Sequence, residues 1–516
     1  MLNKLIESAA RHGINAAADA ADRKRKQKFR AIDDVASQPD HSLVIGETIP
    51  GLRERGKAPK PVSHPLERRK RHMLVTGKSG SGKSNLARLI AQWDIESGKI
   101  GLCCVDFRGE TVDILLREIA AGMQPNTRAQ VAERLLLLDI RESSIFSAPD
   151  EPIVGFNLLQ SLGSDPYVCV AIFMDILSAI WGRETMGVRL SDQLRHSMLA
   201  LCLSPSGPYA LVDLETFLLD TDFRAQVLTG VEDEMVVSYF ARYDNGKDRE
   251  SEAEAVLNKL TLLLSTHRRL RAVLSVRESS FSLEEFLRTR RAPYILICAD
   301  TSRAGKQVAG IVCALLLTAI VRAAMPSDVE PGKARPTPLH LILDEFINYA
   351  AACREPLDEL VREGRKFNLF STMITQSPGL LDSYTSSLAV NVVGNLAYFG
   401  AGPEDANAIA AMIASEDANK TILRTQLLQA RPGEMLFLQE GTALQRVKVI
   451  EAKEPEVSDE AVRALRATAL ARWGTTLQKK VDCPAATPLP VAPIEAREVP
   501  DETGSKKTTG RRRKSS

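Results

Sequence analysis

The sequence predicts an α/β fold, in which the core has a parallel-rich central sheet and carries an inserted subdomain that is entirely helical. From residue 73 onward, short apolar runs alternate with helical segments, the pattern of a parallel sheet with crossover helices. A glycine-rich loop at 77–84 follows the first of these runs and precedes a helical stretch. Between about 165 and 290 amphipathic helical patterns, such as 193–203 and 253–270, replace the apolar runs. Because the apolar runs then resume, the simplest interpretation is one core with a helical insertion.

The strands of the core are predicted from runs that are apolar along their whole length, since such strands are covered on both faces. They are 73–77, 100–106, 135–140, 294–299, 339–344, 369–375, 396–400 and 434–438. The chain is accordingly divided into a charged helical segment at 1–40, a short β lead-in at 41–72, the core at 73–164 and 291–452, the helical subdomain at 165–290, a C-terminal helix (459–473) within 453–481, and a disordered basic tail at 482–516.

The loop at 77–84 matches the complete G-x-x-x-x-G-K-[ST] phosphate-binding pattern. Between a strand and a helix, the backbone N–H groups of such a loop form a nest for phosphate, and the helix dipole adds partial positive charge. The alternative is a Gly/Ser-rich turn that matches the pattern by chance, but such a turn would not need to lie between a strand and a helix. Lys83 is expected to contact the β- and γ-phosphates of ATP, and the Ser84 hydroxyl to bind Mg²⁺. The predicted nucleotide-binding residues are Gly77, Lys78, Ser79, Gly80, Ser81, Gly82, Lys83, Ser84 and Asn85.

Two acids, Asp344 and Glu345, end the apolar run that begins at residue 339. An ATPase with a phosphate-binding loop needs acids at such a strand end. Asp344 is expected to hold the water shell of Mg²⁺, and Glu345 to orient and deprotonate the attacking water. A base for water favours hydrolysis over phosphoryl transfer to a small substrate.

Two further polar residues flank the run at 369–375. Arg365 follows a predicted helix at 357–363 and precedes this run, and Gln376 follows it. Gln376 could bind the γ-phosphate or the attacking water, or it could be a turn residue that contacts backbone. Arg365 could reach the nucleotide of a neighbouring subunit, or it could be a cation at the C-terminus of the helix that interacts with the helix dipole. Position alone leaves both choices open.

Composition sets wider limits. A chain of 516 residues suggests two or three folding units, and a formal net charge of +2 says little about a nucleic-acid partner. Basic clusters at 23–30, 68–71 and 511–514 are either solvated surface or nucleic-acid contacts. The eight cysteines are scattered without a C-x-x-C pair, which argues against a zinc site and fits a reducing cytoplasm. The most apolar helical stretch, 308–324, is short for a membrane span and contains Arg322, so we expect a buried core helix and no intrinsic membrane span.

Five segments together resemble the HerA–FtsK class of ring ATPases, and within it most closely the conjugative coupling proteins of type IV secretion systems. They are VTGKSGSGKSNLA (75–87), VDFRGE (105–110), GFNLL (155–159), LILDEF (341–346) and EGRKFNLFSTMITQS (363–377). The resemblance covers about 43–450. It departs where coupling proteins typically have D-P-K-G-[DE] and N-P-L, because this chain has Phe107, Arg108 and Leu158 there. It also lacks the two N-terminal membrane-spanning helices that are usual in that family.

The resemblance implies a RecA-like core, a hexameric ring and sequence-independent DNA binding. It also implies that Arg365 acts in trans and that Gln376 senses the γ-phosphate. The predicted function is an ATP-hydrolysing motor that translocates DNA in the cytoplasm, with catalytic residues Lys83, Glu345, Arg365 and Gln376. One alternative is a platform that uses nucleotide to assemble and that recruits substrates to a secretion machine. Another is a HerA-like helicase with a nuclease partner. A relaxase or secretion-system partner fits the leading prediction.

Overall fold

The computed structural model describes residues 42–50 and 58–475, with gaps at 124, 143, 149, 163–164, 248, 266, 300, 327–336, 378–386, 389–391 and 415. The predicted helical segment at 1–40 and the predicted tail at 482–516 lie outside the described residues. The basic clusters at 23–30 and 511–514 lie outside them as well.

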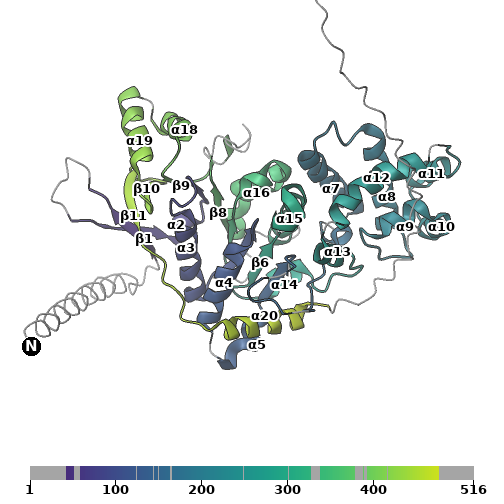
Figure 1. Ribbon diagram of the computed structural model, residues 1–516, viewed down its shortest axis with the longest axis horizontal. Coiled ribbons are helices and arrows are strands. Elements are labelled where there is room, and N and C mark those ends of the chain that lie inside the picture. Colours follow the sequence, from purple (N-terminus) through teal and green to yellow (C-terminus); the bar gives the residue numbers. More distant parts are fainter. Residues whose placement is uncertain are drawn as a thin grey trace, which may run out of the picture. The chain divides into compact units, whose positions relative to one another are not determined.

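One sheet of eleven strands, in the order β2-β1-β11-β10-β9-β3-β8-β7-β4-β6-β5, runs through the described part of the chain (Figure 1). Its parallel strands are β9 (Asn395–Phe399), β3 (Met73–Thr76), β8 (Leu369–Thr375), β7 (Leu339–Leu343), β4 (Gly101–Asp106), β6 (Tyr294–Cys298) and β5 (Leu135–Asp139). The antiparallel strands are β10 (Glu434–Gln439), β11 (Gln445–Val449), β1 (Ser42–Thr48) and β2 (Pro61–Pro65). All eight predicted strands are confirmed, and the β lead-in extends the same sheet.

Helices cover both faces of the parallel strands. Helices α3 (Lys83–Ser97) and α4 (Glu110–Ala121) follow β3 and β4 and carry the chain across the sheet towards β5. Helices α15 (Thr301–Ala324) and α16 (Arg354–Glu363) carry it back from β6 to β7 and β8. Because such crossovers are right-handed, the two pairs lie on opposite faces. Every residue of β5 and β6 is accordingly buried, which explains their uniformly apolar sequences.

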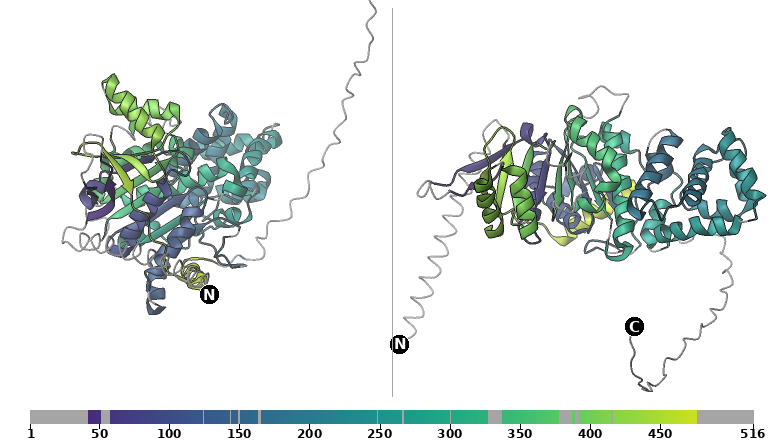
Figure 2. Two further views of the ribbon diagram at one scale, coloured as in Figure 1. Left: turned by 60° about the vertical axis from the view of Figure 1, so that its left-hand side comes forward. Right: turned by 90° about the horizontal axis from the view of Figure 1, so that it is seen from above.

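The segment between β5 and β6 is helical, as predicted, and Figure 2 shows most of it grouped together in blue to teal. Its helices are α6 (Leu158–Ser161), α7 (Pro166–Trp181), α8 (Val188–Leu203), α9 (Asp213–Leu219), α10 (Thr221–Leu228), α11 (Glu234–Asp244), α12 (Arg249–Leu264), α13 (Arg268–Leu274) and α14 (Leu283–Thr289). The pattern at 253–270 is two helices and not one. The reason is that the His267 side chain accepts a hydrogen bond from the backbone N–H of Leu270 and so caps a new helix, α13.

The remaining helices are short or lie at the ends of the sheet. They are α2 (Leu66–Arg69), α5 (Arg128–Ala132), α18 (Pro403–Ile413), α19 (Asp417–Gln429), α20 (Asp459–Trp473), and the 3₁₀ turns at Pro125–Thr127, Phe346–Asn348, Ala350–Cys353 and Gly364–Phe367. Helix α20 has the predicted bounds. It is capped by the Ser458 hydroxyl and packs against α4, α5 and β5.

Helix α15 is longer than the apolar stretch that predicts it. Its segment Ala304–Ala324 has 21 residues, and the most apolar 18-residue window in it has a mean hydropathy of 2.0, so length and composition alone would allow it to cross a membrane. However, 83% of its most apolar window is buried among α7, α14, α16 and β4. This burial favours the interpretation as a core helix.

Parallel pairing brings four loops together at one edge of the sheet. Thr76, the last residue of β3, pairs with Thr375 of β8, and Val105 of β4 pairs with Leu343 of β7. The residues that follow these four strands therefore emerge side by side. In open α/β sheets, ligands bind at this carboxyl edge.

Candidate nucleotide site

The loop between β3 and α3 has a backbone that demands glycine. Gly77, Gly80 and Gly82 all have positive φ, at 152°, 70° and 112°. A Cβ on Gly77 would lie 2.6 Å from the Cβ of Phe399, and one on Gly82 would lie 3.0 Å from the Cα of Gly433. The phosphate-binding pattern therefore has the strand–loop–helix setting that it needs.

The Lys83 ammonium lies beneath this loop. Its Nζ donates to the carbonyl oxygens of Gly77 at 2.6 Å and Lys78 at 3.1 Å. Burial lowers the pKa of Lys83, and the nearby carboxylates of Glu345 and Asp344 oppose that shift. The side chain is thus held in the loop before any nucleotide is bound. By contrast, Lys78, Ser79, Gly80 and Ser84 are exposed at the mouth of the loop.

Three buried hydroxyl groups at this edge have no hydrogen-bond partner within the described part of the chain. They belong to Thr76 at the end of β3, Ser81 in the loop and Thr375 at the end of β8. Unpaired buried hydroxyls are costly. Together with the glycine backbone and the lysine, these free polar atoms fit a polyphosphate group bound over the loop.

Asp344 follows β7 and is held by two donors. Its carboxylate accepts hydrogen bonds from the Thr111 hydroxyl and from the backbone N–H of Glu345, each at 3.0 Å. Burial, with the charge of Asp106, raises the pKa of Asp344 to about 6. The described residues contain no cluster of three or more metal-binding side chains. A magnesium ion held by Asp344 and Ser84 would therefore take its other ligands from phosphate oxygens and water, which is its usual preference.

Glu345 follows β7, and its side chain lies close to residues that follow β4 and β8. Its backbone is left-handed, with φ of 47° and ψ of 38°. Its carboxylate accepts a hydrogen bond from the Gln376 amide, whose Nε2 lies 2.5 Å from Oε1. The guanidinium of Arg108 lies 3.8 Å from the same oxygen. The structure therefore brings together Lys83, Asp344, Glu345 and Gln376, as predicted, and Gln376 contacts a side chain and not only backbone.

Two residues at the site, Arg108 and Thr111, are not predicted from the sequence. Both follow β4, the neighbour of β7 in the sheet. Asp106 shapes this turn, because its carboxylate accepts hydrogen bonds from the backbone N–H groups of Arg108, Gly109 and Val112. The segment VDFRGE contributes to the family resemblance, but only knowledge of the strand order could show that it faces Glu345.

The side chain of Asn85 points away from the loop. Its amide donates to the carbonyl of Ile450 and accepts from the backbone N–H of Ala452, each at 2.9 Å. Arg88 and Gln92, further along α3, contact Lys453 in the same segment. Asn85 thus fastens the segment after β11 to α3, and only its backbone is available to a nucleotide.

Arg365 lies at the opposite edge of the sheet. It is exposed on the 3₁₀ turn that precedes β8, whereas Gln376 follows β8. Seven strand residues separate the two edges by roughly 23 Å. Arg365 borders a hollow of about 730 Å³ that Lys70, Arg71 and Arg362 also line. The last turn of α16 carries Arg362, and the 3₁₀ turn that follows it carries Arg365 and Lys366, so the sequence alternative of a helix-terminal cation still applies to Arg365.

The basic cluster at 68–71 is largely neutralised within the chain. Arg69 is buried and forms an ion pair with Asp94 at 2.6 Å. Lys70 pairs with Glu67, and Arg71 pairs with Glu440. Arg68 donates to Gln439 at 2.7 Å. The sequence left two interpretations of this cluster open, solvated surface and nucleic-acid contact. Arg69 fits neither of them, because it is buried.

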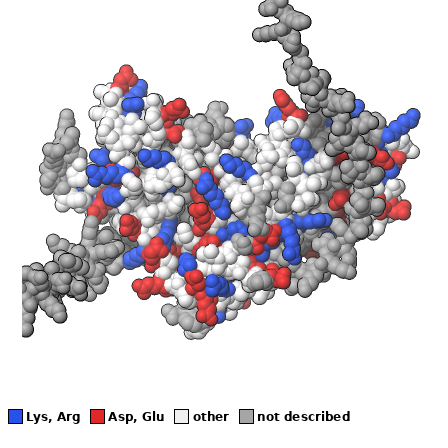
Figure 3. All heavy atoms as spheres, in the orientation of Figure 1, with Lys and Arg blue, Asp and Glu red and all other residues white. Residues whose placement is uncertain are grey.

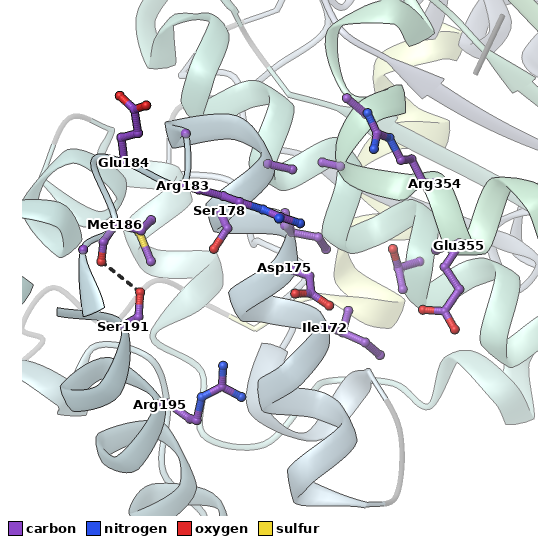
Figure 4. A pocket seen from close by; sticks show the side chains of 18 of the residues that line it. Ile172, Asp175, Ser178, Arg183, Glu184, Met186, Ser191, Arg195, Arg354 and Glu355 are labelled. Carbon is purple, nitrogen blue, oxygen red and sulfur yellow. Dashed lines mark hydrogen bonds between the residues drawn. The ribbon is translucent and has the colours of Figure 1, made fainter. Parts of the chain in front are cut away.

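A hollow of about 1170 Å³ lies away from these residues, between the helical subdomain and the core (Figure 4). It is lined by α7, α8, α15, α16 and the turn at Ala350–Cys353, with charges of both signs from residues such as Asp175, Arg183, Arg195 and Glu355. None of its lining residues belongs to the cluster around Glu345. It has no glycine-rich nest for phosphate, so the loop edge of the sheet is the candidate nucleotide site.

Solved structures with the same fold include a conjugative coupling protein. No protein-family model matches the chain, and no curated protein matches it in sequence. The plasmid coupling protein TrwB in complex with ADP and Mg²⁺ matches with a TM-score of 0.54 at 13% identity, over 82% of this chain and 97% of TrwB. The unbound bacterial coupling protein TrwB lacking its N-terminal 70 residues matches with a TM-score of 0.53 at 12% identity, over 77% and 89%.

A second protein shares the fold at a similar level. VirB4 of Thermoanaerobacter pseudethanolicus matches with a TM-score of 0.50 at 15% identity, over 80% of this chain and 96% of VirB4. The matches extend over nearly the whole length of the solved chains, so they include more than the phosphate-binding loop. The resemblance to coupling proteins is therefore confirmed at the level of the fold: this chain has the α/β architecture of the conjugative coupling protein TrwB and of VirB4.

Proposed function

We propose that the chain is an ATPase of the type IV secretion kind, which forms a ring and uses hydrolysis to move DNA. The observation that carries the proposal is the contact of Glu345 with Gln376 beside the glycine-rich loop. A site that only bound nucleotide would need the loop and Asp344. It would not need a carboxylate positioned by an amide from the neighbouring strand.

The residues divide the chemistry among them. Backbone N–H groups of the loop and the Lys83 ammonium bind the phosphates of ATP and neutralise their charge. Magnesium, when bound at Ser84 and Asp344, would neutralise charge that develops on the β- and γ-phosphates. Glu345 accepts the proton of the attacking water, and Gln376 orients both this carboxylate and the water. Arg108 is close enough to Glu345 to influence its orientation.

The position of Arg365 supports a ring, because this residue lies about a strand length from the loop of its own chain. In a head-to-tail ring, one edge of the sheet can face the opposite edge of the next subunit, so Arg365 can reach a neighbour's γ-phosphate. A guanidinium supplied in this way stabilises the charge of the transition state. We propose a hexamer by analogy with the ring ATPases that the motifs resemble.

DNA is the proposed substrate because TrwB is a conjugative coupling protein. On the face in Figure 3, Lys and Arg are interspersed with Asp and Glu. A cytoplasmic location and a relaxase, secretion-system or nuclease partner belong to the same proposal.

The test is ATP hydrolysis by the full chain with and without DNA. We expect DNA to stimulate hydrolysis. Single-stranded oligonucleotides of unrelated sequence should stimulate it equally, and so should double-stranded oligonucleotides of unrelated sequence. DNA affinity should fall steeply with salt, because phosphate contacts release counterions. Hydrolysis without any DNA affinity at low salt would contradict the motor and support the recruitment platform. Absence of hydrolysis under all these conditions would contradict the ATPase itself.

A further inference from the structure

The hairpin of α18 and α19 is fastened at its base to the phosphate-binding loop. The hairpin lies between β9 and β10 in the chain. Gly400 directly follows β9, and Gly433 directly precedes β10. The backbone N–H of Lys78 donates to the carbonyl of Gly400 at 2.9 Å, and the N–H of Gly433 donates to the carbonyl of Ser81 at 2.8 Å. Both ends of the hairpin are therefore hydrogen-bonded to residues that surround the nucleotide.

A third connection runs from the hairpin to the residue beside Gln376. The Ser377 hydroxyl donates to the carboxylate of Asp405, with Oγ and Oδ1 2.5 Å apart. Asp405 lies in the first turn of α18 and is half-buried. Ser377 directly follows Gln376, which holds Glu345. A short chain of contacts thus leads from α18 through Ser377 and Gln376 to the proposed base.

This connection matters because Gln376 and Ser377 lie beyond the paired part of β8. The last residue of β8 in register is Thr375, opposite Thr76 of β3. Beyond that point, the strand ladder no longer fixes the backbone. The hydrogen bond from the Ser377 hydroxyl to Asp405 supplies a fixed point for the backbone beyond the end of the ladder.

We propose that Asp405 is a positioning residue for ATP hydrolysis, which holds Gln376 against Glu345 by anchoring Ser377. The inference rests on the proposed function, since it assigns a role in that same reaction. Asp405 does not touch the nucleotide loop through its own side chain, so it acts on the rate of the chemical step and not on the binding of ATP. A displacement of about 1 Å at a reacting group can cost roughly 10²-fold in rate.

The test is a set of single variants of the full chain assayed for ATP hydrolysis. Asp405→Ala should lower kcat by roughly 10- to 100-fold with little change in KM for ATP. Asp405→Asn retains an oxygen that can accept the Ser377 hydroxyl, and it should recover most of the lost kcat. Ser377→Ala should resemble Asp405→Ala, and the double variant should be no slower than either single variant, because the two residues share one interaction.

The matched control is Glu404→Ala. Glu404 is the exposed neighbour of Asp405 in the same first turn of α18, so its removal costs the same charge near the helix N-terminus. We expect its kcat to equal that of the wild type. A loss of kcat in Asp405→Ala that also appears in Glu404→Ala would overturn the inference, because a general effect on α18 would then explain it.

Two further outcomes separate this inference from the proposed function. Hydrolysis by the wild type together with an unchanged kcat in Asp405→Ala overturns the inference alone. No hydrolysis by the wild type overturns the proposed function and the inference with it. An Asp405→Asn variant as slow as Asp405→Ala would also overturn the inference, because charge and not the hydrogen bond would then be responsible.

Discussion

At the scale of single residues, the proposed site separates the groups that we expect to bind phosphate from the residue that we propose as the base. Lys83 is buried under its loop and bonded to two carbonyl oxygens, so it also stabilises the loop itself. The Glu345 carboxylate accepts a hydrogen bond from Gln376 and lies 3.8 Å from the Arg108 guanidinium. Changes at these two positions should therefore affect different steps.

Lys83→Ala should abolish ATP binding, because both the charge opposite the phosphates and a support of the loop are lost. Glu345→Gln should bind ATP normally but lower kcat by roughly 10²- to 10⁴-fold, since an amide cannot accept a proton from water. Equilibrium binding of a fluorescent ATP analogue, followed by steady-state hydrolysis, measures the two steps. The control is Glu355→Gln on the exposed face of α16. Normal turnover in Glu345→Gln would remove this residue from the proton-transfer step.

At the scale of elements, the start of β3 is built around a neutral histidine. His72 is buried in front of β3, and its Nδ1 accepts a hydrogen bond from the backbone N–H of Ser371 in β8 at 3.1 Å. Burial, assisted by the charge of His340, lowers the pKa of His72 to about 3. Burial also lowers the pKa of His64. These side chains cannot easily take up a proton while the sheet is intact.

Stability should therefore fall as the pH is lowered below about 6.5. Between pH 6.5 and pH 3 the unfolded His72 binds a proton that the folded one does not, so folding loses about 1.4 kcal/mol for each pH unit. At pH 5 this residue alone accounts for roughly 2 kcal/mol. Urea unfolding at pH 7.5 and pH 5 measures the difference.

The control for this prediction is His72→Asn, because asparagine tolerates the positive φ of 60° at this position and does not titrate. It should have a smaller difference in stability between the two pH values. An equal difference in both proteins would show that other groups cause the pH dependence.

At the scale of the whole molecule, functional residues stand at both edges of one sheet. The loop, Glu345 and Gln376 occupy the carboxyl edge, and Arg365 occupies the other. A single chain cannot bring them together, because β8 itself separates them. A second copy of the chain can, and this makes the oligomer testable through activity.

Arg365→Ala should lose most turnover, by about 10³- to 10⁵-fold, while it retains ATP affinity. Mixing it with Lys83→Ala should restore part of the activity. Some interfaces then combine the intact loop of the first variant with the intact Arg365 of the second.

The matched control mixes Arg365→Ala with a chain that carries both Lys83→Ala and Arg365→Ala. This mixture has no intact Arg365 and should remain inactive. If mixed oligomers form and stay inactive, Arg365 does not act in trans, and Arg362 or Lys366 becomes the next candidate.

The sequence by itself determined the local structure and the parts of the site that are contiguous. Strands such as β5 were predictable because burial on both faces requires an uninterrupted apolar run. The loop at 77–82 was predictable because its backbone angles permit only glycine at several positions. Asp344 and Glu345 were identified because they end an apolar strand in a chain that has such a loop.

Only the tertiary structure decided which residues meet across the sheet. The order of the strands places β4 beside β7, and this brings Arg108 and Thr111 to the two acids. It also buries Arg69, turns Asn85 towards Ile450, and joins Asp405 to Ser377. Strand order depends on long-range packing and not on the local pattern of the chain, so contacts between segments far apart in sequence could not be read from the residues alone.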